Sequence, residues 1–97
     1  MIVGKKHEID NRVLLAVCDK EYIGKKFENE KLEITISEKF YNGQELDKNQ
    51  LINLMNESDS INLFGEKCVN IAKEEGLISE KSIIMINNVP HAQVYRM

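Results

Sequence analysis

A histidine next to a proline is the residue of this chain with the clearest potential for chemistry. His91 lies in the stretch Val89-Pro90-His91-Ala92-Gln93. Proline fixes its own φ and restricts the residue before it, so the imidazole is held at a defined place. Near neutral pH an imidazole can carry a proton or pair with an anion. The alternative is a structural histidine whose ring bonds a backbone carbonyl, and we favour it because no nucleophile or carboxylate partner is visible.

The segment from Asn62 to Glu66 is the second candidate site. If a helix begins near Gly65, its free N–H groups can hold a phosphate or a carboxylate, and the glycine lets a ligand approach closely. If the helix begins at Ser60, Gly65 lies inside it and serves close packing against a neighbour. We favour packing, and the start of this helix stays open.

An aromatic pair suggests contact with nucleic acid. Phe40 and Tyr41 precede an Asn-Gly turn, and on a strand they would point to opposite faces. One ring is then in the core, and an exposed Tyr41 can stack a base. The candidate binding residues of the whole chain are Lys20, Lys25, Lys26, Tyr41, Asn62, Gly65, Glu66, His91 and Gln93.

The charge distribution limits how strongly such a surface can bind nucleic acid. The net charge is −3, with six basic and four acidic groups in residues 1–26, so this segment carries +2 and the remainder −5. A dedicated nucleic-acid clamp usually has a basic excess over the whole domain. A mixed, solvated surface with one weakly basic side is therefore expected.

The cysteines and motifs predict no catalytic residue, metal or cofactor. Cys18 and Cys68 lie far apart among apolar neighbours, which favours reduced, buried thiols. A metal site would need both of them to converge with His7 and His91, and Cys68 as a nucleophile would have to leave the apolar stripe of its helix. Phosphate-binding loops, dinucleotide fingerprints, CxxC and HExxH are missing from the sequence.

Length and composition indicate one soluble globular domain. The 97 residues are 42% hydrophobic and 30% charged, which is ordinary for such a domain over residues 1–97. No apolar run approaches the ~18 residues of a membrane span, and no secretory signal is visible. We therefore expect a cytoplasmic protein that does not insert into membranes.

The strands are predicted from hydrophobic periodicity. From Arg12 to Cys18 apolar residues occupy both odd and even positions, as in a central strand covered on both faces. From Lys31 to Ser37 apolar and polar residues alternate, as in a half-exposed strand. Met1 to His7 is a possible edge strand. Ser82 to Asn87 contains a short buried strand, and Val94 to Met97 a possible last edge strand.

Two helices are predicted between these strands. Asp47 caps the first, with Gln50 three residues later as in a capping box. The second ends at Gly76, which suits the C′ position, and apolar residues from Ile61 to Ala72 follow helical spacing. The fold class is therefore α+β, a single-domain two-layer sandwich with a mixed, largely antiparallel sheet and two helices packed on it. Exposed edges and a small core make a homodimer plausible.

The order and spacing of several short stretches resemble the archaeal domain-of-unknown-function 424 family over roughly residues 2–95. The resemblance implies an archaeal, cytoplasmic, single-domain α+β protein of undetermined function, whose genes tend to lie among genes for translation and ribosome biogenesis. The family has no established catalytic residues, so none is carried over. The stretches are Ala16-Val17-Cys18-Asp19 with Ile23-Gly24-Lys25, Phe40-Tyr41-x-Gly43, Asn62-Leu63-x-Gly65-Glu66 and Val89-Pro90-His91-Ala92-Gln93.

Two functions follow from these observations. The first is a small non-catalytic binding module associated with RNA or the translation and ribosome machinery. The alternative is a small enzyme or anion or metabolite binder that uses a helix N-terminus and His91. The burial and bonding of His91 discriminate between them, because a ring bonded to the main chain is not available for proton transfer.

Overall fold

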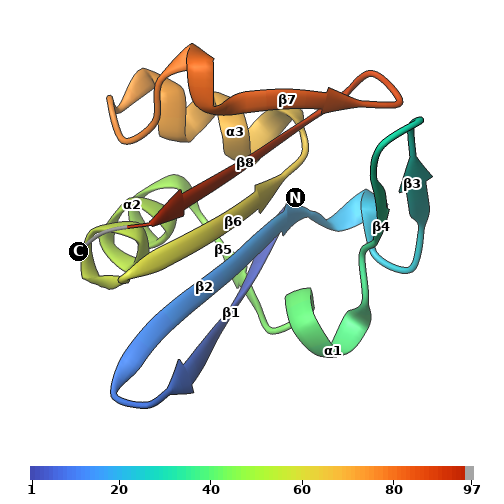
Figure 1. Cartoon of the computed structure of the whole chain (residues 1–97). Helices are drawn as coiled ribbons and strands as arrows, with labels where there is room; N and C mark the ends of the chain where they lie inside the picture. The colour runs from blue at the N-terminus through green and yellow to red at the C-terminus, as the bar shows by residue number, and fades with distance from the viewer. Residues whose placement is uncertain (96–97) are drawn as a thin grey trace.

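The chain forms a six-stranded sheet with the strand order β5-β1-β2-β6-β8-β7, and a separate hairpin (Figure 1). The computed structural model describes residues 1–95. Neighbouring strands of the sheet are antiparallel except β2 and β6, which are parallel. The strands of the sheet are β1 (Ile2–Ile9), β2 (Arg12–Asp19), β5 (Gln44–Leu46), β6 (Ser60–Phe64), β7 (Ile83–Ile86) and β8 (Val89–Tyr95).

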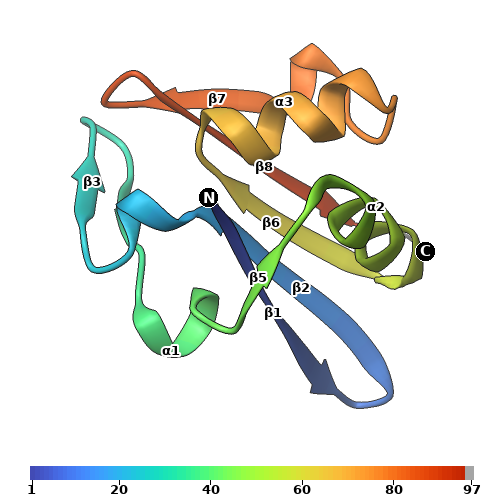
Figure 2. The same cartoon turned by 180° about the vertical axis from the view of Figure 1, so that it is seen from behind.

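The remaining elements cover the two faces of this sheet. The helices α2 (Lys48–Glu57) and α3 (Glu66–Glu74) lie on one face (Figure 2). The other face carries the hairpin of β3 (Lys26–Glu28) and β4 (Glu33–Thr35) and the helix α1 (Glu38–Tyr41). Short 3₁₀ turns, η1 (Lys20–Tyr22) and η2 (Glu80–Ser82), follow β2 and precede β7.

Each face of the sheet has its own buried cluster. Leu15 and Val17 of β2 pack with α2 and α3, whereas Ala16 and Cys18 pack on the hairpin side. The prediction of a central strand with apolar residues at both parities is thus confirmed, as is the α+β class with a mixed, mostly antiparallel sheet. Both cysteines are free and buried, as expected.

The predicted helix ends are also confirmed. The Asp47 side chain accepts a bond from the Gln50 N–H, and the Gln50 side chain accepts one from the Asp47 N–H. At the end of α3, Gly76 has φ +72°. The Gly76 N–H donates to the Lys73 carbonyl, and the Leu77 N–H donates to the Ala72 carbonyl. These two bonds are the pair expected of a Schellman cap.

The predicted helical face that begins at Ile61 is wrong over its first turn. Residues 60–64 form β6, a central strand, and α3 begins only at Glu66 with Gly65 as its N-cap. Ile61 and Leu63 pack toward the helices, whereas Phe64 packs toward the hairpin. Apolar residues at i and i+3 fit a strand covered on both faces as well as a helix, so the five residues 60–64 do not distinguish the two periodicities.

The two strands predicted at the edges of the sheet are in fact interior, because each pairs with a further strand that sequence periodicity does not reveal. β1 is interior, because β5 pairs with its outer side, and β8 is interior between β6 and β7. Val94 belongs to β8, and the rest of the predicted last strand, residues 96–97, lies outside the described residues. The Lys31 to Ser37 strand shortens to Glu33–Thr35, and Phe40 and Tyr41 lie in a short helix capped by Ser37.

Among residues 1–95, no helix is both long enough and apolar enough to cross a membrane.

Candidate functional site

Cross-strand register arranges the side chains of the hairpin-side face into rows. The row Val3–Cys18–Phe64–His91–Ile84, which we call the covered row, lies mostly beneath the hairpin. The next two rows, which we call the open rows, lie beyond the hairpin itself, and of their residues Ala16 still belongs to the buried hairpin-side cluster. They are Lys5–Ala16–Asn62–Gln93 and His7–Leu14–Ser60–Tyr95.

The open rows bring together two of the predicted binding residues. Asn62 and Gln93 are directly opposite each other on β6 and β8. Gln93 is exposed and Asn62 half-buried, so both amides are accessible from this face. Cross-strand partners have Cβ atoms about 5 Å apart, which lets two amides contact one flat group together.

A tyrosine that the sequence interpretation missed lies beside this amide pair. Tyr95 is 72% exposed, and its hydroxyl donates a long hydrogen bond of 3.4 Å to Oε1 of Gln93. The signal that identifies it is strand alternation, because Gln93 and Tyr95 must share a face once residues 89–95 form one strand.

The far side of the open rows carries a stacked pair and a lysine. The His7 ring stacks on Phe40 with centroids 4.7 Å apart and planes 17° apart, and its Nε2 lies 2.8 Å from the Phe40 carbonyl oxygen. Lys5 Nζ donates to the Lys39 carbonyl at 2.9 Å. The eight side chains of the open rows include no carboxylate, although the chain is acidic overall.

A hollow of about 370 Å³ lies where the open rows meet the hairpin. Its walls are apolar on the hairpin and β7 sides and polar along β8. The lining residues are Leu32, Ile34, Ser82, Ile84, His91, Gln93 and Tyr95.

His91 reaches this hollow only with the edge of a buried ring. The side chain is 4% exposed, and its Nδ1 lies 2.9 Å from the Leu63 carbonyl oxygen. A carbonyl only accepts hydrogen bonds, so Nδ1 carries the proton. Burial lowers the pKa of His91, and the bond to Leu63 opposes that shift only in part. The ring is therefore a neutral structural group, which is the structural role that we favoured for it.

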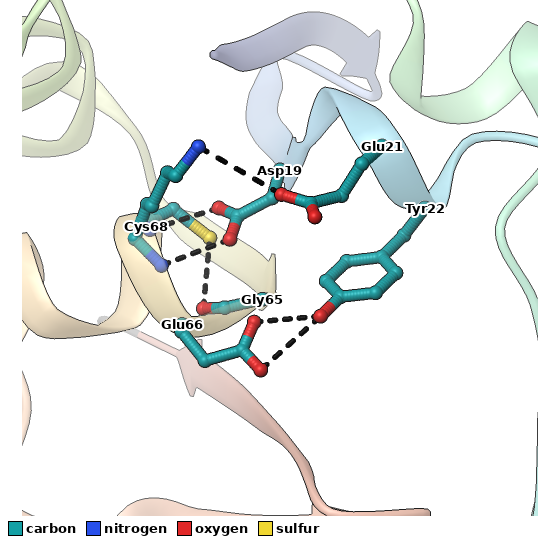
Figure 3. A network of polar contacts seen from close by, with 7 residues as sticks. Asp19, Glu21, Tyr22, Gly65, Glu66 and Cys68 are labelled. Atoms are coloured by element: carbon teal, nitrogen blue, oxygen red, sulfur yellow. Dashed lines mark hydrogen bonds and ion pairs between the residues drawn. The ribbon is translucent and has the colours of Figure 1, made fainter.

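The N-terminus of α3 is occupied by a side chain of the protein itself (Figure 3). The fully buried Asp19 carboxylate, at the end of β2, accepts the N–H groups of Lys67 at 2.9 Å and of Cys68 at 3.0 Å. Burial raises the pKa of Asp19, and these two bonds partly oppose the shift. The carboxylate takes the place that a bound anion would need.

Gly65 is required by this arrangement. Its φ is +122°, and a Cβ added there would overlap Cγ of Asp19. The glycine therefore makes room for a carboxylate of the same chain, which is neither the interior helix packing that we favoured nor the approach of a ligand. With Asp19 at the helix N-terminus and His91 bonded to the main chain, the enzyme or anion-binder alternative loses both of its supports.

Glu66 joins the same network and links α3 to η1. The Tyr22 hydroxyl donates to the Glu66 carboxylate at 2.7 and 3.1 Å, and this bond is the main reason why the pKa of Tyr22 rises to about 12. Beside it, Glu21 and Lys67 form an exposed ion pair at 3.8 Å. Glu66 is thus engaged in holding two elements together.

Burial also makes the nearby thiols of Cys18 and Cys68 unreactive. Burial raises the pKa of Cys68 well above its ordinary value, and burial raises that of Cys18 to about 12. The Cys68 thiol donates to the Gly65 carbonyl at 3.6 Å. Thiolates, the nucleophilic form, are disfavoured at both positions.

The other predicted binding residues lie apart from the open rows. Lys20 pairs with Glu45 of β5 at 3.1 Å, three strands from β6 in the sheet order. Lys26 pairs with Glu33 at 3.4 Å on the outer side of the hairpin, and Lys25 precedes it. Lys26 is kept from the open rows by strand alternation, because Phe27 and Ile34 of the hairpin face the sheet and Lys26 therefore faces away.

Tyr41 is a further correction. It is buried in the hairpin-side cluster, and burial raises its pKa to about 12. The expected exposed ring is wrong because residues 38–41 form a helix, which turns Tyr41 inward and leaves Phe40 half-buried. A base cannot stack on Tyr41 without unpacking the core.

Comparisons with known proteins agree with the fold and add no activity. The chain is similar to a protein from Methanopyrus kandleri whose solved structure is described as that of an uncharacterised conserved protein, with a TM-score of 0.83 and 26% identity over 99% of this chain and 91% of that one. No curated protein matches the sequence. Residues 7–97 match the family described as "Protein of unknown function (DUF424)". The chain therefore belongs to the DUF424 family.

Proposed function

We propose that the protein is a non-catalytic binding module that associates with RNA of the translation machinery through its open rows. The observation that carries the proposal is the composition of this surface. In a chain of net charge −3, the eight side chains of these rows include a lysine and a histidine but no carboxylate. Among these eight side chains a polyanion therefore meets no negative charge.

The open rows have the groups that single-stranded RNA requires. An exposed ring such as Tyr95 stacks an unpaired base. The amides of Asn62 and Gln93 can donate to and accept from base edges, which are accessible only in unpaired RNA. Lys5 can contact a phosphate beside them.

The expected affinity is modest. Lys5 belongs to the open rows, and Arg12 lies on the same face two register rows further along β2, so about two phosphates would be neutralised. The slope of log K against log salt concentration is then about −1.4 for a single strand. Such a module depends on several weak contacts and is expected to release RNA at high salt.

The experiment is fluorescence anisotropy of labelled single-stranded RNA, with a duplex of the same sequence as a comparison. We expect Tyr95→Ala to weaken binding about tenfold, because base stacking contributes roughly 1–3 kcal/mol, whereas Tyr95→Phe keeps the ring and the binding. Lys5→Ala should weaken binding and flatten the salt slope, with Lys26→Ala, a lysine on the outer side of the hairpin, as the matched control.

Three outcomes would overturn the proposal. They are no retention of RNA at low salt, a salt slope near zero, or an equal effect of Lys5→Ala and Lys26→Ala. A pull-down with and without RNase tests the cellular association. Ribosomal or initiation proteins that are retained after RNase treatment would show a protein-binding module instead of an RNA-binding one.

A further inference from the structure

The outer edge of β7 lacks the charged or proline residues that often prevent an edge strand from pairing with another chain. β7 ends the sheet and reads Ile83-Ile84-Met85-Ile86, without a charge or a proline. The opposite edge, β5, has only three residues and carries Glu45 in an ion pair with Lys20. Both edge strands are short, but charge is a common protection of sheet edges and of the two strands only β5 has it.

The backbone groups of Met85 point outward from this edge. Asn87 and Asn88 have φ of +52° and +65°, as in a two-residue I′ turn. Ile86 and Val89 close this turn and exchange backbone hydrogen bonds. Hydrogen-bonded and non-hydrogen-bonded pairs alternate along an antiparallel ladder, so the backbone N–H and C=O of Ile84 also bond to β8. The N–H and C=O of Met85 then face away from β8, and the C=O of its cross-strand partner Pro90 likewise faces away from β7 and accepts from the Gly65 N–H at 2.9 Å.

Apolar side chains flank this edge on both faces. Ile84 is exposed beside the 370 Å³ hollow of the hairpin side. Met85 is 55% exposed on the helix side, beside a second hollow of about 310 Å³ lined by Val69, Ile83 and Pro90 among others. A strand laid along β7 would therefore find an apolar place on each face.

We propose that a second copy of this chain occupies the edge, with β7 pairing antiparallel to its own equivalent about a two-fold axis. The Met85 N–H of each copy then donates to the Met85 C=O of the other, so that both groups are satisfied, as an isologous interface requires. The apolar side chains of each β7 would extend over the hollows of the other copy. The charged rim of the helix-side hollow is already neutralised by the Lys73–Glu80 ion pair at 3.5 Å, so two copies do not repel there.

This dimer would be weak and does not depend on RNA binding. Four strand residues bury less than the ~1,200 Å² of a stable interface, so association should become visible only between about 10 µM and 1 mM. The open rows of both copies would lie on the same side of the joined sheet, because antiparallel pairing keeps each face continuous.

Sedimentation velocity over that concentration range tests the proposal on the full chain. We expect a monomer–dimer equilibrium that Met85→Lys weakens at least about tenfold, since a lysine protects an edge strand. Ile9→Lys, at an apolar residue of similar exposure (60%) on β1, is the matched control and should leave the equilibrium unchanged. A monomer at every concentration, or equal effects of the two variants, would overturn the proposal and leave the edge to a strand of another protein.

Amide hydrogen exchange of the wild-type protein provides a second readout that needs no variant. The Met85 N–H should exchange more slowly as protein concentration rises, whereas the Ile84 N–H, which bonds to β8, should not change. A Met85 exchange rate that is independent of concentration, in a sample that sedimentation shows to be dimeric, would place the interface elsewhere.

Discussion

Two aromatic residues on the same face of adjacent strands have opposite environments. Phe64 of β6 is fully buried in the covered row, with ring contacts to Tyr22, Phe27 and His91. Tyr95 of β8 lies in the outer open row and is 72% exposed. The difference comes from the β3–β4 hairpin, which covers one end of the face and leaves the other accessible. Coverage by a distant segment, more than residue type, separates core from candidate binding surface in this protein.

The comparison predicts its largest effect at the covered row. Phe64→Ala should lower the free energy of unfolding by about 3–5 kcal/mol, because a large buried ring leaves a cavity among side chains that cannot all collapse into it. Urea denaturation followed by circular dichroism measures the loss. A loss below about 1 kcal/mol would mean that the hairpin packs loosely and that the covered row is not a core.

The second prediction compares two aspartates that cap helices. Asp19→Ala should destabilise the fold by about 2–3 kcal/mol, because it leaves two backbone N–H groups of α3 without their buried acceptor. Asp47→Ala removes an exposed cap of α2 and should reduce stability by about 1 kcal/mol. Chemical denaturation of both variants tests the order, and an equal loss would contradict the structural role assigned to burial.

The third prediction concerns pH and the histidine of the covered row. Burial lowers the folded-state pKa of His91 below its unfolded value, so the unfolded chain binds the proton first as pH falls. Its contribution to stability is full above the unfolded value of about 6.5 and is lost as pH decreases toward the folded pKa, by at most about 1.4 kcal/mol per pH unit. His91→Gln, which keeps a hydrogen-bond donor but does not titrate, should reduce this slope in denaturation at several pH values. An unchanged slope would show that the ring titrates freely.

The smallest effect on stability is expected in the open rows. Tyr95→Ala should change the free energy of unfolding by no more than about 0.5 kcal/mol, because the exposed ring stabilises no core. Measured beside Phe64→Ala in the same urea series, it sharpens the contrast between the two aromatics. A loss comparable to that of Phe64→Ala would mean that the open rows are part of the core and are not a binding surface.

The local features of the fold were largely predictable from the sequence. Asp47 with Gln50, and Gly76 at the end of α3, depend on bonds within a few residues, and both caps are present. The apolar residues at both odd and even positions from Arg12 to Cys18 correctly indicate a central strand that is covered on both faces. The start of the second helix was left open over residues 60–64, since five apolar-rich residues fit both periods and their pairing with β2 and β8 is long-range.

The candidate site was predictable only in part. Asn62, His91 and Gln93 do lie on one face, but His91 is closed off by its bond to Leu63. Lys20 and Lys26 are held elsewhere by Glu45 and Glu33. Tyr95 was missed because the last strand was predicted to begin at Val94, whereas residues 89–95 form one strand on which Gln93 and Tyr95 share a face.

By itself, the sequence determined the α+β class, the caps and the buried thiols, because periodicity and short-range bonding depend on residues that are close together in the chain. The family was indicated separately, by the resemblance of several short motifs, and the match over residues 7–97 shows it. The tertiary structure decided which polar groups are available. Asp19 meets the α3 N-terminus 48 residues away, and the hairpin covers one end of the face but not the other. Both outcomes depend on contacts between distant segments, whose geometry arises only when the whole sheet is assembled.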